Sequence, residues 1–160
     1  METDGDYDDR SGSPEQDAQV IRLRPLRVLI VSLDHRFRAV IEMLIARRGC
    51  SVFSLSTPDS VTRTVVDERV DVVLVDGAPA LREVAQGIAR SDASLPPVGV
   101  VLVTERDQPT PPGWRALAKW DPFEELFDAV LDADRARSLP PSTDRASATG
   151  PREVPGRELG

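Results

Sequence analysis

The sequence predicts a single α/β domain built on a parallel β-sheet, and three observations carry that prediction. Short β-branched runs alternate with segments of helical periodicity along residues 26–137, as is typical of βαβ units. The runs are apolar at consecutive positions, as in strands that are buried on both faces of a sheet. One of them, VDVVLVD at residues 70–76, ends in a carboxylate followed by Gly77, and open α/β sheets place reactive groups at such strand ends.

The length and composition fit one small globular domain. The chain has 160 residues, of which 40% are apolar, and no apolar run approaches the roughly 18 residues that cross a bilayer. The acidic start METDGDYDD lacks the apolar region of a signal peptide. Cys50 and His35 are the only residues of their kinds, which excludes an internal disulfide and disfavours a His-based zinc site or a Ser-His-Asp triad. We therefore expect a soluble cytoplasmic protein that does not enter a membrane.

Charge is distributed unevenly along the chain. Within the net charge of −7, residues 1–25 contribute seven acids against three arginines, and residues 26–137 contribute seventeen acids against fourteen bases. An acidic chain without a basic stripe argues against nucleic acid as a partner, because phosphate neutralisation dominates that kind of binding. The polar residues 1–25 and the Pro-, Ser- and Arg-containing residues 138–160 are predicted to be disordered tails around a domain at 26–137.

The first half of the domain contains two predicted strand–helix units. Residues 27–32 (RVLIVS) form a strand, and Asp34 is placed to cap the helix that follows. Gly49 suits the left-handed position after that helix. The helix should bury an apolar stripe made of Phe37, Val40, Ile41, Leu44 and Ile45. Residues 51–55 form a second strand, and Pro58 begins a helix that its β-branched residues make intrinsically weak. The inward face of that helix should contain Val61, Val65 and Val66.

The second half continues from the strand that ends at Asp76. Pro79 begins a third helix, whose inward positions are Leu81, Val84, Ala85 and Ile88. Residues 98–104 (VGVVLVT) form a fourth strand that ends in a hydroxyl, and residues 114–119 form a short fifth strand. Between these two strands, residues 105–112 contain three prolines, which disfavour a regular helix.

The last helix has a strong start signal. Asp121 is predicted to be its N-cap, with Pro122 at the first helical position and Glu124 completing a capping box. Its inner face should contain Phe123, Leu126, Phe127, Val130 and Leu131.

Five short strands joined by right-handed crossovers suit a flavodoxin-like parallel sheet in the order 2-1-3-4-5. In that order the carboxyl ends of the first, third, fourth and fifth strands face one crevice. The residues expected there are Ser32, Leu33, Asp34, Asp76, Thr104 and Lys119. Lys119 is the only lysine among twenty basic residues, and lysine supplies a compact point charge where arginine supplies a planar fork.

A strand-end Asp, Thr and Lys in this order resemble the receiver domain of two-component response regulators. The resemblance spans about residues 26–137, and four blocks carry it: LRVLIV, VDVVLVD, VVLVT and ALAKWDPFEEL. It implies that Asp76 accepts a phosphoryl group from a histidine kinase, that Thr104 hydrogen-bonds this group, and that Lys119 pairs with it or with unmodified Asp76. A hydroxyl donor and a nearby cation suit the added charge of an acyl phosphate.

The sequence also departs from the receiver pattern. Receivers place two acidic residues after the first strand to hold Mg²⁺, whereas this chain has Ser32 and Leu33 there, and leucine offers no oxygen ligand. Asp34 follows one position later and suits a helix N-cap better than a metal site. Trp120 stands where the family usually has proline after its lysine. The short connection after Thr104 leaves no room for the usual fourth helix, so we expect a different output surface.

These departures predict a degenerate receiver that acts by protein–protein contact, either without a cofactor or with Mg²⁺ weakly bound by Asp76 and Asp34. Its partner would be a histidine kinase or a downstream signalling protein, and a homodimer is also compatible with the sequence. The main alternative is a working phosphoacceptor in which Asp34 restores the metal site, since phosphoryl transfer depends on Mg²⁺. An independent enzyme is not expected, because the crevice offers no nucleophile–base pair besides Asp76 and no Gly-rich phosphate loop.

A small-ligand module is a further alternative. Residues 32–52 faintly resemble cobalamin-binding domains, which carry an Asp-x-His motif near a first helix, although Asp34 and His35 are adjacent here. A solvated residue in the first helical turn is the simpler interpretation of His35. The simpler interpretation of Cys50 is a small, half-buried residue between a helix and a strand.

Overall fold

Five parallel strands form one sheet in the order β2-β1-β3-β4-β5, as the sequence predicts. The computed structural model describes residues 24–90, 95–105 and 114–139, so most of the predicted proline-containing connection lies outside it. Of the predicted tails it describes only residues 24–25 and 138–139, and Ser138 is the last residue of a helix. The strands are β1 (Arg27–Val31), β2 (Ser51–Leu55), β3 (Val72–Asp76), β4 (Gly99–Thr104) and β5 (Arg115–Ala118).

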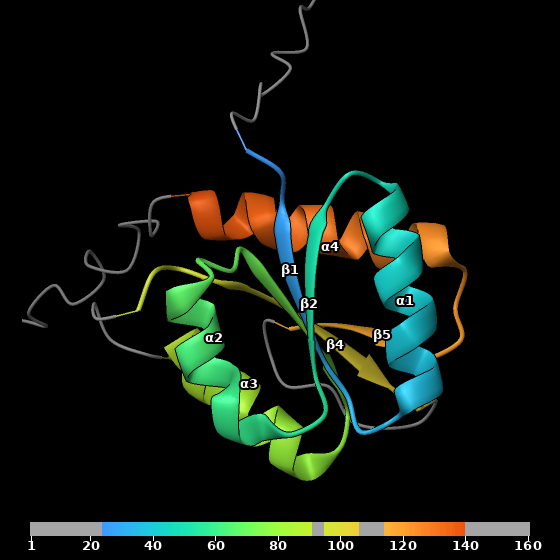
Figure 1. Ribbon diagram of the computed structural model, residues 1–160, viewed down its shortest axis with the longest axis horizontal. Coiled ribbons are helices and arrows are strands. Elements are labelled where there is room, and N and C mark those ends of the chain that lie inside the picture. Colours follow the sequence, from blue (N-terminus) through green and yellow to red (C-terminus); the bar gives the residue numbers. More distant parts are fainter. Residues whose placement is uncertain (1–23, 91–94, 106–113, 140–160) are drawn as a thin grey trace, which may run out of the picture.

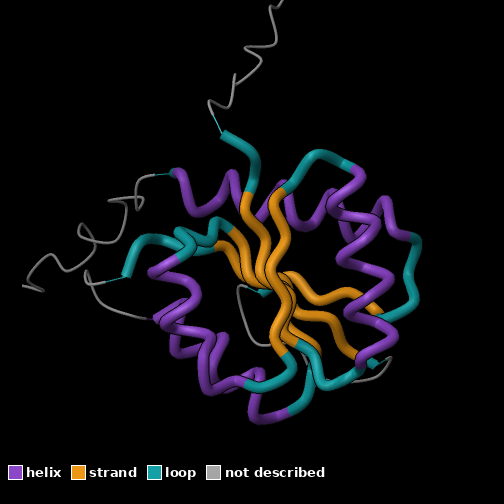
Figure 2. The backbone as a smooth tube through the Cα atoms, viewed as in Figure 1, coloured by secondary structure: helices purple, strands orange, loops and turns teal. Residues whose placement is uncertain are grey.

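Helices cover both faces of the sheet (Figures 1 and 2). Two helices, α1 (His35–Arg47) and α4 (Phe123–Ser138), pack on one face. The other face carries α2 (Val61–Asp67), which follows a 3₁₀ turn at Pro58–Ser60, and α3 (Pro79–Arg90). The described part of the chain has no helix between β4 and β5. No described helix has the length and apolar content that a membrane span requires.

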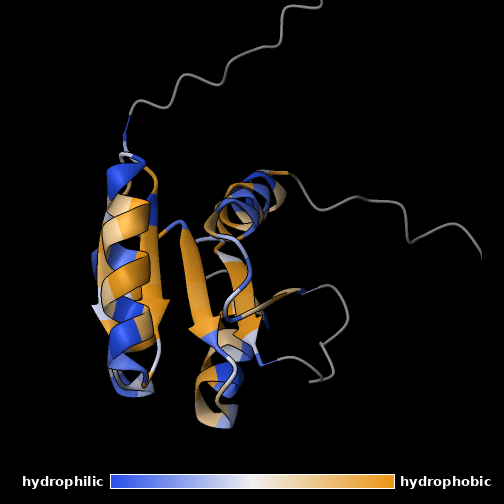
Figure 3. Ribbon diagram, turned by 90° about the vertical axis from the view of Figure 1, so that its right-hand side faces the viewer, coloured by the Kyte–Doolittle hydropathy of each residue, from blue (hydrophilic) through white to orange (hydrophobic). Residues whose placement is uncertain are grey.

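Alternate residues of each central strand belong to two separate cores. In β3, Val72 and Leu74 pack toward α1 and α4, whereas Val73 and Val75 pack toward α2 and α3. All four side chains are almost fully buried. The central strands are therefore mostly hydrophobic, between helices of mixed character (Figure 3), which is why the sequence shows them as continuous apolar runs.

The predicted ends of α1 are confirmed, but the predicted start of α4 is wrong. Asp34 caps α1, because its Oδ1 accepts hydrogen bonds from the backbone N–H groups of Arg36 (2.9 Å) and Phe37 (3.1 Å). Gly49 has the left-handed conformation, with φ of 80°. At α4, however, Pro122 is the N-cap. The Asp121 carboxylate instead accepts a hydrogen bond from the backbone N–H of Ala118 at 2.8 Å and closes the turn after β5.

Two residues predicted to face inward are exposed. Val40 on α1 and Val66 on α2 have 45% and 46% of their surface exposed. The reason is the 3.6-residue helical period, which turns consecutive side chains by about 100°. Ile41 and Val65 occupy the inward direction and are buried, so their neighbours Val40 and Val66 point away. The predicted α1 residue Leu44 and α3 residue Val84 are only half-buried.

Candidate functional site

The carboxyl ends of three strands bring four of the predicted residues into one hydrogen-bonded cluster. Asp76 is the last residue of β3, Ser32 and Asp34 follow the neighbouring strand β1, and Lys119 follows β5 at the edge of the sheet. Because β4 lies between β3 and β5, only a long side chain from the end of β5 can reach Asp76.

Lys119 lies at the centre of this cluster. Its Nζ is 2.9 Å from Asp76 Oδ2 and 3.0 Å from Asp34 Oδ2, and only 12% of its side chain is exposed. The same ammonium lies 5.1 Å from the ring centroid of Phe37, a cation–π distance. Burial disfavours the charged form of Lys119, but its hydrogen bonds to Asp76 and Asp34 outweigh that effect and raise the pKa above its ordinary value.

Asp34 belongs both to α1 and to the site. While its Oδ1 caps the helix, its Oδ2 pairs with Lys119. The backbone N–H of Phe37 and the Lys119 ammonium both stabilise the carboxylate and hold the pKa of Asp34 below its ordinary value. The sequence favoured the N-cap role over a metal-binding role, and the structure shows that Asp34 caps α1 and also pairs with Lys119.

Ser32 lies where the sequence predicts it, but the sequence did not reveal its hydrogen bonds. Its side chain is fully buried, its hydroxyl donates a 2.7 Å hydrogen bond to Asp76 Oδ2, and the same oxygen accepts one from Asp34 N at 3.0 Å. The hydroxyl therefore joins the end of β3 to the start of α1 and orients Asp76. Leu33, by contrast, is 65% exposed and contributes no polar group.

Thr104 is connected to the cluster through its backbone. It ends β4 one residue beyond Val103, the register partner of Asp76, and only 6% of its surface is exposed. Its carbonyl accepts a 2.9 Å hydrogen bond from the backbone N–H of Lys119. Trp120 is 72% exposed, and its ring contacts Phe37 edge-on with 6.0 Å between the centroids.

The oxygen ligands of the site fit a Mg²⁺ ion poorly. An open cavity above the cluster is lined by Asp34, Asp76, Glu105 and Lys119 among others. Asp34 and Asp76 both pair with the Lys119 ammonium there, and Leu33, between Ser32 and Asp34, supplies no oxygen ligand. Across the described ranges, no group of three or more His, Cys, Asp or Glu side chains is arranged to hold a metal ion.

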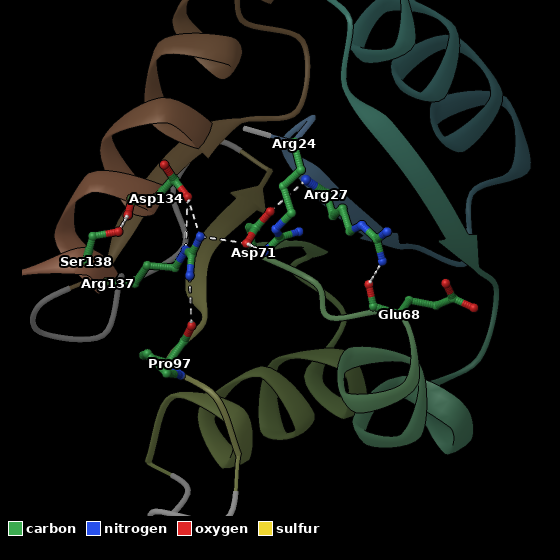
Figure 4. Close-up of polar contacts among 8 residues, drawn as sticks. All are labelled: Arg24, Arg27, Glu68, Asp71, Pro97, Asp134, Arg137 and Ser138. Carbon is green, nitrogen blue, oxygen red and sulfur yellow. Dashed lines mark hydrogen bonds and ion pairs between the residues drawn. The ribbon is translucent and has the colours of Figure 1, made fainter. Parts of the chain in front are cut away.

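A second charged cluster lies at the opposite end of the sheet, around the buried Asp71 (Figure 4). Asp71 Oδ1 accepts hydrogen bonds from Arg24 (2.7 Å) and Arg137 (2.6 Å), and its Oδ2 accepts one from the backbone N–H of Arg27 (2.9 Å). Arg137 also pairs with Asp134 at 2.8 Å. This cluster joins the beginning of the described chain, the start of β3 and the last turn of α4.

Sequence reasoning missed the Asp71 cluster, although the chain does contain a signal for it. Asp71 interrupts the apolar run that leads into β3, and Asp134 lies four residues after the buried Val130 on the inner face of α4. An acidic residue on a buried face requires a partner, because unpaired buried charge is costly. Arg137 follows Asp134 at the i,i+3 spacing of a helical ion pair, but nothing in the sequence identifies Arg24 or Arg137 as a partner of Asp71.

The fold is shared with solved structures of response regulators. A receiver protein from Sinorhizobium medicae WSM419 superposes with a TM-score of 0.60 at 18% identity, covering 72% of this chain and 99% of that one. A putative response regulator from Chloroflexus aurantiacus gives 0.61 at 15% identity, covering 70% and 99%. A receiver domain from Clostridium thermocellum gives 0.57 at 17% identity, covering 70% and 96%. No protein-family model matches the chain, and no curated protein matches it in sequence. The chain therefore has the fold of receiver domains.

Proposed function

We propose that the chain is a receiver-like module of cytoplasmic two-component signalling, which acts by contacting a partner protein and accepts a phosphoryl group at Asp76 weakly or not at all. The receiver fold supports the signalling role. The observation that best supports the degenerate form is the Lys119 ammonium, which pairs with both Asp76 and Asp34.

The charges at the site explain why phosphorylation would be weak. Transfer of a phosphoryl group to a carboxylate brings two anions together, and a metal ion normally neutralises that charge. Here Lys119 is already shared by two carboxylates, and Ser32 and Leu33 supply no acidic ligand after β1. Under this proposal Mg²⁺ binds weakly, and any remaining phosphoryl group on Asp76 is held by Lys119 and the Thr104 hydroxyl.

A working phosphoacceptor is the second candidate, and one observation favours it. The carboxylates of Asp34 and Asp76 lie 3.0 and 2.9 Å from the same cation, the ammonium of Lys119. Two carboxylates that meet at one point are the minimum that a Mg²⁺ site in a receiver would need, together with water and phosphate oxygens. Under this second candidate function, Asp34 supplies the acidic ligand that Leu33 cannot supply.

Two-dimensional amide NMR spectra of the full chain, with and without Mg²⁺ and beryllofluoride, separate the two candidates. Beryllofluoride stands in for a phosphoryl group on an aspartate. We expect the spectrum to stay unchanged at millimolar Mg²⁺. Shifts centred on Asp76, Thr104 and Lys119 would overturn the degenerate reading and establish a competent site.

Two variants make the outcome specific. Asp76→Asn removes the proposed acceptor, and Asp34→Asn removes the second carboxylate while keeping an N-cap, because asparagine caps helices well. If Mg²⁺ and beryllofluoride shift the amide signals of the wild type, a working site requires that neither variant shows those shifts. Asp59→Asn, in the 3₁₀ turn before α2, is the matched control and should behave as wild type.

A further inference from the structure

The outward face of α1 exposes two large apolar side chains, Val40 and Met43. Its exposed residues follow helical spacing along one stripe, here called the outer stripe, which consists of Arg36, Ala39, Val40, Met43, Ala46 and Arg47. Val40 and Met43 are 45% and 46% exposed. The opposite face is buried in the core. A helix that is apolar on two sides normally packs on two sides, so the outer stripe is expected to have an occupant. Figure 3 looks onto this side of the domain.

The outer stripe is positively charged at both ends. Arg36 and Arg47 are exposed and form no ion pair with any residue that the structure describes. The two neighbouring arginines are engaged elsewhere: Arg38 in α1 donates to the Ser32 carbonyl, and Arg48, at the C-cap of α1, lies over the Phe127 ring. Eleven residues of helix place the Arg36 and Arg47 charges about 16 Å apart. An antiparallel second copy would bring arginine against arginine, so the charges favour an acidic occupant.

The chain itself carries an acidic segment that can reach the outer stripe. Residues 1–9 (METDGDYDD) contain five acids and no base, with Met1 and Tyr7 as apolar side chains. Arg24, the first described residue, lines the same pocket as Arg48 at the C-terminal end of α1. The fifteen residues from Asp9 to Arg24 can span up to about 50 Å, whereas α1 is about 20 Å long.

We propose that the acidic segment at residues 1–9 folds back onto the outer stripe of α1, with its carboxylates on Arg36 and Arg47 and its apolar side chains on Val40 and Met43. Tethering makes this contact intramolecular, at an effective concentration of about millimolar for a short flexible linker. The charges make it sensitive to salt. The proposal concerns the outward face of α1, whose Arg36 end adjoins the Asp34 cap, and it does not depend on the proposed function.

A nitroxide label near the N-terminus tests this contact in the full chain. Thr3→Cys is labelled in a Cys50→Ser background, and amide signals are compared before and after the nitroxide is reduced. We expect selective loss of signal along α1, with α2 and α3 on the other face of the sheet unaffected, and recovery of the signal at high salt. Equal loss over all three helices, or loss that high salt does not reverse, would overturn the proposal.

Charge variants identify the contact itself. Arg36→Glu together with Arg47→Glu should abolish the selective loss, whereas Arg63→Glu on α2, where the side chain is 85% exposed, should leave it intact. Unchanged loss in the double variant would contradict the proposal. A mixture of chains that carry the nitroxide with isotope-enriched chains that lack it tests whether a second copy of the chain covers α1 instead. Signal loss in that mixture would mean that a second copy covers α1.

A second measurement avoids replacing Cys50. With the native cysteine retained, asparagine in place of Asp4, Asp6, Asp8 and Asp9 should shift the amide signals of the outer stripe. Glu15→Gln with Asp17→Asn neutralises acids of the same tail outside the proposed segment, and should leave those signals in place. Shifts of equal size in both variants would refute the assignment to residues 1–9.

Discussion

Single side chains in the site hold more than one element in place. Asp34 caps α1 with one oxygen and pairs with Lys119 through the other, and Ser32 links Asp76 to the backbone of Asp34. Lys119 joins both carboxylates from the far side of β4. The geometry of the site therefore depends on a few contacts that also organise the ends of β1, β3 and β5.

Substituting Asp34 should change how stability depends on pH. The folded pKa of Asp34 lies below its ordinary value, so its charge stabilises the fold at neutral pH, and this contribution disappears as the pH falls through the folded pKa. Asp34→Asn keeps the helix cap and removes the charge. We expect wild type to be more stable than the variant at neutral pH, with the difference in urea midpoint shrinking below about pH 4.

Lys119 sets the upper pH limit of this stability difference between the wild type and Asp34→Asn. Because its pKa is raised in the folded state, the contribution of Lys119 is complete at pH values below its ordinary pKa while its carboxylate partners are ionised, and it is lost as the pH rises through the folded pKa. The Asp34→Asn difference should therefore stay constant between about pH 5 and pH 9. A difference that varies steeply within that range would show that another group controls it.

At the scale of elements, β4 and α4 approach each other closely at Gly99. Gly99 lies at the start of β4, where an added Cβ would be 2.6 Å from the backbone carbonyl oxygen of Ala133. Because a backbone atom cannot rotate away as a side chain can, Gly99→Ala must push α4 from the sheet. We expect a loss of about 1–3 kcal/mol in the free energy of unfolding, measured by urea denaturation.

Gly87 on α3 is the matched control. A Cβ added there would meet nothing within 4 Å, and alanine is the better helix former by about 1 kcal/mol. Gly87→Ala should therefore stabilise the protein. If Gly99→Ala is equally harmless, then α4 does not approach β4 as closely as the structure shows.

At the scale of the whole molecule, the Asp71 cluster holds distant parts of the chain together. Asp71 and Asp134 have side chains that are 3% and 5% exposed, and Arg137 is their shared partner. Arg137→Met would leave two buried carboxylates short of a cation. We expect a loss of about 3 kcal/mol in the free energy of unfolding, by urea denaturation.

Arg135→Met on the same helix provides the comparison for this prediction. Arg135 is 72% exposed and pairs with the exposed Asp132, and exposed pairs contribute at most about 1 kcal/mol. Arg135→Met should therefore change the free energy of unfolding very little. Similar effects of the two substitutions would mean that the cluster around Asp71 does not stabilise the fold.

The sequence by itself determined the order of strands and helices, the cap at Asp34 and the strand-end positions of Asp76, Thr104 and Lys119. These features depend on local patterns of burial and turn chemistry, which a chain displays residue by residue. The sequence-based prediction placed Val40 and Val66 in the core. It was wrong because an apolar side chain can be buried, but its residue type does not show which side of the helix faces the sheet. It also misplaced the start of α4, because Asp121 can satisfy a backbone N–H on either side of Pro122.

Only the tertiary structure decided which polar groups meet. The contacts of Lys119 with Asp34 and Asp76, of Ser32 with Asp76, and of Asp71 with Arg24 and Arg137 join residues that are far apart in sequence. Each depends on the order of the strands, on the reach of a side chain across a neighbouring strand, and on the exclusion of water. These conditions exist only once the sheet has assembled and its helices have closed over it.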